Sequence, residues 1–241
     1  MNKRNTLFLI GGIVLLATII GSYFFFSTKN EEKKTDAVLF KEEYESLNGQ
    51  VSSSGKEYRI ITIDENNPFL YQSAEEIVNR IEKKETFAVY FGFSSCPWCR
   101  SMIPSFIEVA KDLSLSKIYY VDISKIRDVK EIQDGKVHTV QEGTEGYLKL
   151  LEYFNDVLDE YTLKDENQKE IKVGEKRIYA PNVISVVEGK VDSMTTGISK
   201  KQVDAYMDLT EDMKTEMYHQ LKCILECIKE NEAVCTKPTA C

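Results

Sequence analysis

Two cysteines separated by two residues are the part of this chain best suited to chemistry. Cys96, Pro97, Trp98 and Cys99 follow the apolar run 87–93 and lead into a helical pattern. A helix N-terminus carries unpaired N–H groups and a partial positive charge, so a thiolate placed there is stabilised. The spacing also lets the two sulfurs meet, so the pair can alternate between dithiol and disulfide. We expect Cys96 to be exposed, to have a lowered pKa and to attack a partner's sulfur, while Cys99, one turn deeper, resolves the mixed disulfide.

Other chemistries of this cysteine pair are less well supported. A C-x-x-C pair can be half of a zinc site, but such sites usually contain two pairs, and this chain has one. A Cys–His hydrolase that uses Cys96 and His138 is disfavoured because Cys99 accompanies Cys96. Redox chemistry is therefore the preferred interpretation.

The composition limits the classes of function further. The chain has 241 residues, of which 42% are hydrophobic, so it can bury one core with a small appendage. Its formal net charge of −8 argues against nucleic-acid binding, because contacts to phosphates need a basic surface. The sequence has no glycine-rich phosphate loop and no metalloprotease or serine-hydrolase motif. We expect no metal and no cofactor other than the redox-active cysteine pair.

Residues 7–26 form an uncharged, mostly apolar stretch near the N-terminus. At ~1.5 Å per helical residue this stretch would cross the ~30 Å hydrocarbon core of a bilayer. Lys3 and Arg4 precede it as in a signal sequence, but no cleavage site of small residues follows, so a retained anchor is favoured. Similar numbers of basic residues flank the stretch on both sides, so they barely decide the orientation of this segment in the membrane. The even number of cysteines, six, fits an oxidising compartment, and we place the rest of the chain outside the cell membrane.

The residue pattern predicts strands and helices that alternate and end in a hairpin and a helix. Helices are expected at 39–47, 73–84 with a capping box at Ser73, 96–113 with a kink at Pro104, 145–161, and from Ser199 through Met207. Strands are expected at 58–63, 87–93, 118–123, near 161–164 and 170–173, and at 183–187 and 191–194. This order indicates an α/β protein with a small mixed sheet flanked by helices.

Several of these segments resemble the thioredoxin fold. The motif Cys96-Pro97-Trp98-Cys99 is similar to the active site of that family, and Pro104 is similar to its kinking proline. Ala180-Pro181 resembles the cis-proline that faces the two cysteines, and 188–191 with 197–203 resembles the last hairpin and helix. The resemblance implies thiol–disulfide exchange with protein or peptide substrates. Among relatives, the chain looks most like membrane-anchored thioredoxin-like proteins and bacteriocin-transport accessory proteins of Gram-positive bacteria.

Two features depart from that family. Many thioredoxins have a buried aspartate six residues before the first cysteine, whereas this chain has Tyr90. Tyrosine is a poor proton acceptor near neutral pH, so proton transfer at Cys99 must use water or another group. The interval 124–177 is also longer than compact members use, and we expect a helical insertion there. It serves either to choose partners or to stabilise the domain.

The C-terminal segment is rich in cysteine. Thr210 is expected to cap a helix with an apolar stripe, and the cysteines of the segment are Cys223, Cys227, Cys235 and Cys241. Two structural disulfides are the favoured interpretation, and the nested pairing 223–241 with 227–235 is one of three connectivities. A second redox relay and a four-cysteine zinc site remain as alternatives.

The resulting domain prediction has four segments: an anchor at 1–29, a tether at 30–37, a thioredoxin-like domain at 38–209, and a helical cysteine-rich extension at 210–241. The predicted function is a single-pass, membrane-tethered extracytoplasmic thiol–disulfide oxidoreductase, which could receive electrons from a donor in the membrane. The alternative is a non-catalytic accessory or binding protein that supports peptide export. Intact Cys96 and Cys99 favour the enzyme, because a scaffold would not need both.

Overall fold

The computed structural model describes residues 33–229. The predicted anchor at 7–26 lies outside these residues, as do Cys235 and Cys241. Within 33–229, no helix combines the length and the apolar character needed to cross a bilayer. The elements below belong to one compact unit that begins at Asp36.

In this unit, single helices and strands alternate over residues 36–122, and strands in hairpins dominate the rest. The helices are α2 (Asp36–Glu45), α3 (Ala74–Glu82), α4 (Pro97–Asp112), α5 (Glu145–Phe154) and α6 (Glu211–Lys229). The strands are β1 (Phe69–Tyr71), β2 (Phe87–Gly92), β3 (Ile118–Asp122), β4 (Val129–Gln133), β5 (Lys136–Gln141), β6 (Asp159–Lys164), β7 (Glu170–Arg177), β8 (Asn182–Val187) and β9 (Lys190–Thr195). The prediction of a mixed sheet flanked by helices is confirmed.

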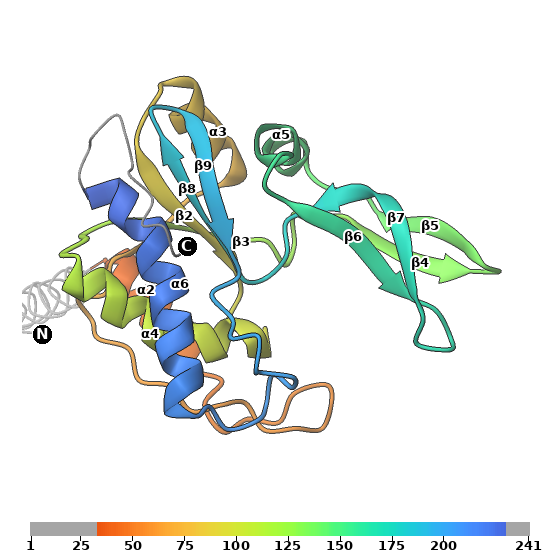
Figure 1. The fold of residues 1–241 in the computed structure, drawn as a ribbon, viewed down its shortest axis with the longest axis horizontal. Helices are drawn as coiled ribbons and strands as arrows, with labels where there is room; N and C mark the ends of the chain where they lie inside the picture. Colours follow the sequence, from red (N-terminus) through yellow and green to blue (C-terminus); the bar gives the residue numbers. More distant parts are fainter. Residues whose placement is uncertain (1–32, 230–241) are drawn as a thin grey trace, which may run out of the picture. The chain divides into compact units, whose positions relative to one another are not determined.

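Strand β2 is the centre of a five-stranded sheet in the order β1-β3-β2-β8-β9 (Figure 1). Strands β1, β3 and β2 run parallel, β8 pairs antiparallel with β2, and β9 pairs antiparallel with β8. Every residue of β2 is buried. A strand covered on both faces needs a nearly continuous apolar sequence, and the run Phe87–Gly92 provides one.

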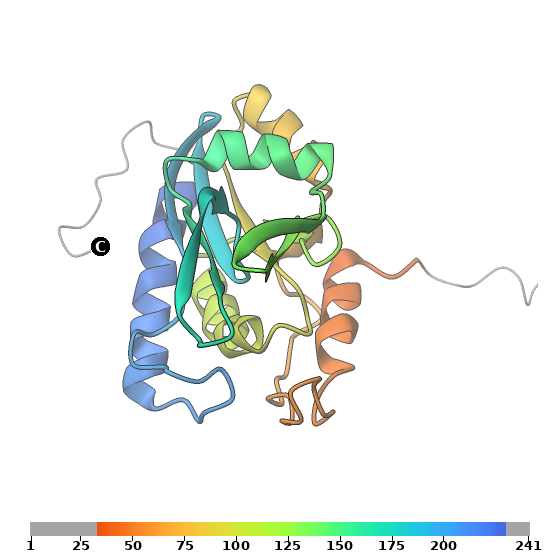
Figure 2. The same cartoon turned by 90° about the vertical axis from the view of Figure 1, so that its right-hand side faces the viewer.

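The two faces of β2 belong to different parts of the core. Ala88 and Tyr90 point into one cluster, which includes residues of α2, α4 and α6. The alternate residues Phe87, Val89 and Phe91 point into a second cluster with residues of α3 and α5. The period of two along a strand explains this division. In Figure 2, α6 (blue), α4 (yellow-green) and α2 (orange) follow one another along the first face of the sheet, and α5 (green) lies across the second face.

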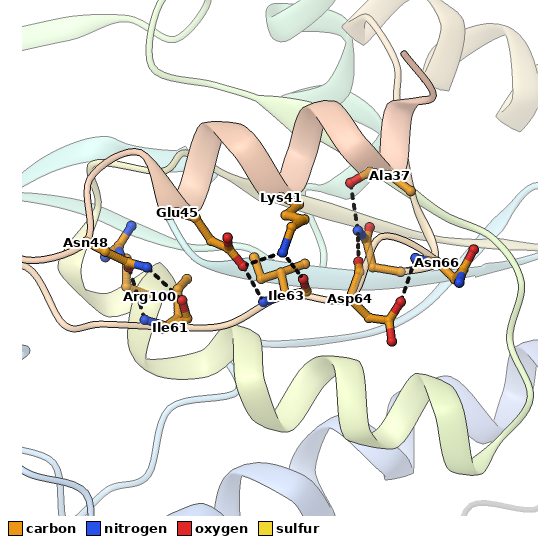
Figure 3. A network of polar contacts seen from close by, with 10 residues as sticks. Ala37, Lys41, Glu45, Asn48, Ile61, Ile63, Asp64, Asn66 and Arg100 are labelled. Atoms are coloured by element: carbon orange, nitrogen blue, oxygen red, sulfur yellow. Dashed lines mark hydrogen bonds and ion pairs between the residues drawn. The ribbon is translucent and has the colours of Figure 1, made fainter.

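The predicted strand at 58–63 is wrong. Its residues form an extended segment outside the sheet, and the edge strand is the short β1 at 69–71. Side chains at the end of α2 take the backbone hydrogen bonds that a neighbouring strand would otherwise make (Figure 3). The Asn48 side chain hydrogen-bonds both the N–H and the C=O of Ile61. At Ile63, Glu45 accepts a hydrogen bond from the backbone N–H, and Lys41 donates one to the backbone C=O.

The predicted helix from Ser199 through Met207 is also wrong, because this stretch is a loop with turns. Its apolar Val203 is 84% exposed while its polar Ser199 and Gln202 are buried, so burial in this loop does not follow the apolar face of a helix. The helix that completes the first face is α6, whose Met217, Leu221 and Leu225 are fully buried. Thr210 caps it, accepting a hydrogen bond from the Met213 N–H at 3.3 Å. The apolar face of α6 therefore belongs to the first core cluster.

The insertion at 124–177 contains more strand than the predicted helical segment would. Helix α5 ends at Phe154 instead of 161. In the sequence it stands between two antiparallel hairpins, β4–β5 and β6–β7, and both hairpins lie on the same side of it in Figure 1. Leu158 and Tyr161, which the predicted helix would include, are buried, but they lie in a loop and in β6. The hairpin β6–β7 matches the predicted strands, whereas β4–β5 was not predicted. Helix α5 packs beside α3, so part of the insertion contributes to the second core cluster.

Candidate functional site

The cysteine motif lies where β2 ends and α4 begins. Cys96 has extended backbone angles and is the N-cap of α4, and Pro97 is the first helical residue. Proline suits this position because its missing N–H would have no partner in the first turn. The N–H of Cys99 donates a hydrogen bond to the Cys96 sulfur at 3.4 Å. The helix start therefore holds the Cys96 sulfur against its own unpaired N–H groups.

The structure brings Ala180 and Pro181 to this motif. The Phe91–Asn182 register places the start of β8 beside the end of β2, and the Ala180–Pro181 bond, which is cis, immediately precedes β8. The Cys96 thiol donates to the Ala180 carbonyl oxygen at 3.3 Å. Two segments far apart in the sequence thus meet at one sulfur, as the thioredoxin resemblance implies.

Cys96 is much less exposed than the sequence predicts. Cys96 is only 6% exposed, and Cys99 is 0% exposed. The sulfur of Cys96 is covered by its contacts with Ala180 and with the first turn of α4, next to the half-buried Trp98. Both cysteines are free thiols. Of the two, only Cys96 retains any surface for an incoming sulfur.

Hydrogen bonds lower the pKa of Cys96. The largest cause is a hydrogen bond from the Cys99 thiol, and the N–H groups of Cys99 and Trp98 act in the same direction. The positive charge of Arg127 lowers this pKa further, whereas burial opposes it. The net effect favours the thiolate at Cys96.

Burial raises the pKa of Cys99 well above its ordinary value, and the hydrogen bond it donates to Cys96 adds to this. The Tyr90 hydroxyl acts in the opposite direction, because it hydrogen-bonds the Cys99 sulfur and favours the thiolate. The pair therefore has one sulfur that ionises readily and one that keeps its proton, as two-step exchange requires.

Arg100 fixes the end of α2 beside the motif. Its guanidinium is fully buried and donates to backbone carbonyls of Tyr44 at 2.7 Å, Arg59 at 2.7 Å and Ser94 at 3.4 Å. It also donates to the side-chain oxygen of Asn48 at 2.6 Å, a contact visible in Figure 3. A planar fork with five donors suits such a set of acceptors. The position next to Cys99 was visible in the sequence, but this role was not.

Arg127 also acts on Cys96, and the sequence did not indicate it. It follows β3 at the base of the insertion, and its guanidinium lies over the Phe93 ring at 5.1 Å from the centroid. No local motif marks it, because its proximity to Cys96 depends on how the insertion leaves the sheet. The insertion thus supplies a positive charge to the site.

The remaining candidate residues lie elsewhere. Cys223 and Cys227 of α6 are each disulfide-bonded, but Cys235 and Cys241 lie outside the described residues, so the connectivity stays a prediction. His138 is on the exposed strand β5, opposite Glu131. Across residues 33–229, no three metal-binding side chains are grouped so that they could hold an ion.

Comparison with known proteins gives no family assignment: the chain matches no protein-family model and no curated protein.

Proposed function

We propose that the chain is a thioredoxin-like thiol–disulfide oxidoreductase acting on protein or peptide substrates. The observation that carries this proposal is the asymmetry of the two free thiols. Cys96, at the helix N-cap, has a lowered pKa, and Cys99, buried beneath it, has a raised one. The order of the sheet strands and the meeting of Cys96 with the Ala180–Pro181 segment support the fold assignment.

The chemistry takes place in two steps. The Cys96 thiolate attacks one sulfur of a substrate disulfide, and the other substrate sulfur leaves as a thiolate that takes a proton from solvent. Cys99 then loses its proton and attacks Cys96, and the second substrate sulfur leaves and ends as a thiol. Two electrons pass from the protein dithiol to the substrate, and Cys96 and Cys99 become a disulfide. The opposite direction oxidises a substrate dithiol, and the relative potentials decide which occurs.

The small exposed area of Cys96 restricts the substrates. A partner's sulfur has to reach Cys96 past Trp98 and Ala180, which are half-buried. An extended, flexible segment meets this requirement better than a disulfide inside a folded domain.

We also propose that residues 7–26 anchor the protein in the cell membrane, with the described unit outside and an electron donor in the membrane. The apolar character of 7–26 and the disulfide-bonded state of Cys223 and Cys227 support this location, because disulfides persist in oxidising compartments.

An insulin-reduction assay tests the activity. The full chain with dithiothreitol should accelerate the precipitation of insulin chains, and Cys96→Ser should abolish the acceleration. Cys99→Ser should instead accumulate a mixed disulfide at Cys96, which mass spectrometry of the non-reduced protein can locate. A fully reduced wild-type protein without activity would contradict the proposal.

One observation favours the alternative, a non-catalytic accessory protein for peptide export: Cys96 is only 6% exposed. A scaffold can keep two buried thiols as packing groups. In that case the wild type and Cys96→Ser would give the same insulin kinetics, and Cys99→Ser would trap no substrate.

A further inference from the structure

Four side chains with polar groups gather where the two ends of the insertion meet the sheet. They are Asp128 before β4, Tyr161 on β6, Arg177 at the end of β7 and Tyr179 just after it, and we call them the base cluster. Asp128 and Arg177 are each 6% exposed, and Tyr161 is 4% exposed. Charged residues are seldom buried this far without a partner, so the contacts within the cluster decide whether it is stable.

Arg177 joins strands from both hairpins of the insertion. Its guanidinium donates to the Asp128 backbone carbonyl at 3.0 Å, and it lies 3.9 Å from the Asp128 carboxylate. The same guanidinium lies over the Tyr161 ring, 3.8 Å from the centroid. The Tyr161 hydroxyl in turn accepts a hydrogen bond from the Lys130 N–H of β4 at 3.3 Å. The first strand of each hairpin and the end of β7 are therefore fastened together.

Tyr179 fastens the next part of the chain to β6. The β6–β7 ladder shifts register between Glu160 and Thr162. The Tyr179 hydroxyl donates to the Glu160 carbonyl at 3.1 Å and accepts from the Thr162 N–H at 3.0 Å. A bulge interrupts the regular pairing of a ladder, and this hydroxyl supplies backbone hydrogen bonds on either side of the irregularity. The Tyr179 N–H also donates to the side-chain oxygen of Asn182 at 2.6 Å.

The segment that the base cluster holds is the one that covers Cys96. Ala180 follows Tyr179 directly, and its carbonyl oxygen lies 3.3 Å from the Cys96 sulfur. Ile178 is fully buried in the second core cluster, between the fixed side chains of Arg177 and Tyr179. Three consecutive residues are thus held before the chain reaches Ala180. The cover over Cys96 therefore depends on the insertion as well as on the sheet.

Building on the proposed function, we propose that the base cluster positions Ala180 over Cys96 and so determines which disulfides reach the reactive sulfur. Arg177 and Tyr179 are positioning residues in this role, since they act on Cys96 through Ala180. With the cluster intact, Cys96 accepts extended, flexible segments. If the cluster is loosened, residues 177–180 open locally and admit bulkier partners.

The first test measures how fast iodoacetamide alkylates Cys96 in the reduced full chain. Mass spectrometry at low conversion separates Cys96 from Cys99. Rates are compared on the plateau of each rate–pH profile, where Cys96 is fully ionised, so that differences in its ionisation do not contribute. A covered thiol reacts as its cover opens, so the rate follows the free energy of local opening.

Tyr179→Phe removes the two hydrogen bonds to β6 and should raise the rate at Cys96 about three- to tenfold. Its matched control is Tyr153→Phe. This change removes another tyrosine hydroxyl of the insertion, which donates to Glu82 at 3.4 Å, and it should alter the rate by less than about twofold.

A second variant removes the two buried charges together. Arg177→Met combined with Asp128→Asn leaves no unpaired charge in the core, as a single substitution would, and should raise the rate at Cys96 about tenfold or more. Lys172→Met removes an exposed cation of the same strand and is the control, with a rate within about twofold of the wild type. Should the double variant not fold, Tyr179→Phe decides.

Cys99 is the internal reference, because it is fully buried and should react only when the fold opens more widely. Faster alkylation of Cys96 with Cys99 still protected supports the inference. Equal rates in Tyr179→Phe and Tyr153→Phe would overturn it. Parallel labelling of both cysteines would also overturn it, because the variant would then have lost the fold and not only the cover.

Single-turnover reduction of insulin, which begins with attack by Cys96, tests the effect on substrates. It should accelerate in the same order as alkylation. If the wild type is active but the variants alkylate faster without reducing insulin faster, the limit on substrates is refuted. If the wild type reduces no insulin while the variants still alkylate faster, the proposed function fails and the positioning of Ala180 stands.

Discussion

The two faces of the central strand differ in what they bury. On the face toward α2, α4 and α6, the core holds two thiols, several tyrosine hydroxyls and the guanidinium of Arg100. On the face toward α3 and α5, the hydrophobic cluster includes Tyr147, whose hydroxyl has no hydrogen-bond partner, and the buried Asp128–Arg177 pair is the charged group that acts on it. A buried polar group is costly unless it is paired, so the first face can hold its chemistry only because its groups bond one another.

Adjacent residues of β2 illustrate the difference. Tyr90 and Phe91 are both fully buried, yet the Tyr90 hydroxyl hydrogen-bonds the Tyr44 hydroxyl at 2.7 Å, whereas the Phe91 ring packs edge-on against Phe154 with the ring centroids 5.7 Å apart. The comparison teaches that the first face sets the reactivity of the site, while the second face mainly supplies apolar burial.

The largest expected effect on stability comes from the second face. Phe91→Ala should lower the free energy of unfolding by about 3–5 kcal/mol, because it leaves a cavity among well-packed aromatic rings. Tyr90→Phe keeps the ring and should cost about 1–2 kcal/mol for the lost hydrogen bonds. Urea denaturation of both variants measures the difference. A greater loss of stability in Tyr90→Phe than in Phe91→Ala would break the comparison.

The next effect concerns Arg100 on the first face. Arg100→Met should lower the free energy of unfolding by about 2–3 kcal/mol, because the carbonyls of Tyr44 and Arg59 lose their donors. Arg100→Lys keeps the charge without the fork and should fall between Met and the wild type. The rate of Cys96 alkylation by iodoacetamide is the control, and it should stay near the wild-type rate. If Arg100→Met left the free energy of unfolding unchanged but altered the rate of Cys96 alkylation, Arg100 would act on the site through its charge and not by holding α2.

Local signals explain which elements could be predicted. The capping box at Ser73 is formed as the sequence indicates, with Ser73 and Glu76 bonding each other's backbone N–H groups. The apolar run of β2 and the positive-φ turn at Glu188 and Gly189 are likewise local features. Gly189 is required there, since a Cβ would lie 2.4 Å from the Ile81 carbonyl oxygen. The capping box, the apolar run and the turn are each visible in residues close together in the sequence, whereas the close contact that requires Gly189 comes from a distant segment.

The errors arise where burial comes from distant contacts. Leu158 and Tyr161 continue the helical spacing of α5, but a loop and β6 bury them, so the periodicity overstates the helix. Strand β5 is exposed at every residue, so it has no alternation to detect. Strand β1 has three residues and offers too short a pattern.

The distinction between local signals and distant contacts also applies to the residues of the site. The cysteine motif and Ala180–Pro181 were found from their own residues. Tyr44 and Arg127 were not, because α2 and the insertion reach the cysteines only through the packing of the sheet.

The smallest effect tests whether the insertion reaches across to the chemistry of the first face. Arg127→Ala removes a positive charge that lowers the pKa of Cys96, so that pKa should rise toward its ordinary value. At a pH between the pKa of Cys96 in the wild type and in the variant, the variant contains less thiolate. Its rate of alkylation by iodoacetamide should then be roughly two- to threefold lower than that of the wild type. Added salt should make this difference smaller, because it screens the charge of Arg127 in the wild type. Above both pKa values the two proteins should react alike. Lys125→Ala, which removes an exposed charge two residues away, is the matched control and should leave the profile in place. Equal shifts in both variants would indicate a general effect of net charge, and the insertion would then have no specific electrostatic contact with Cys96.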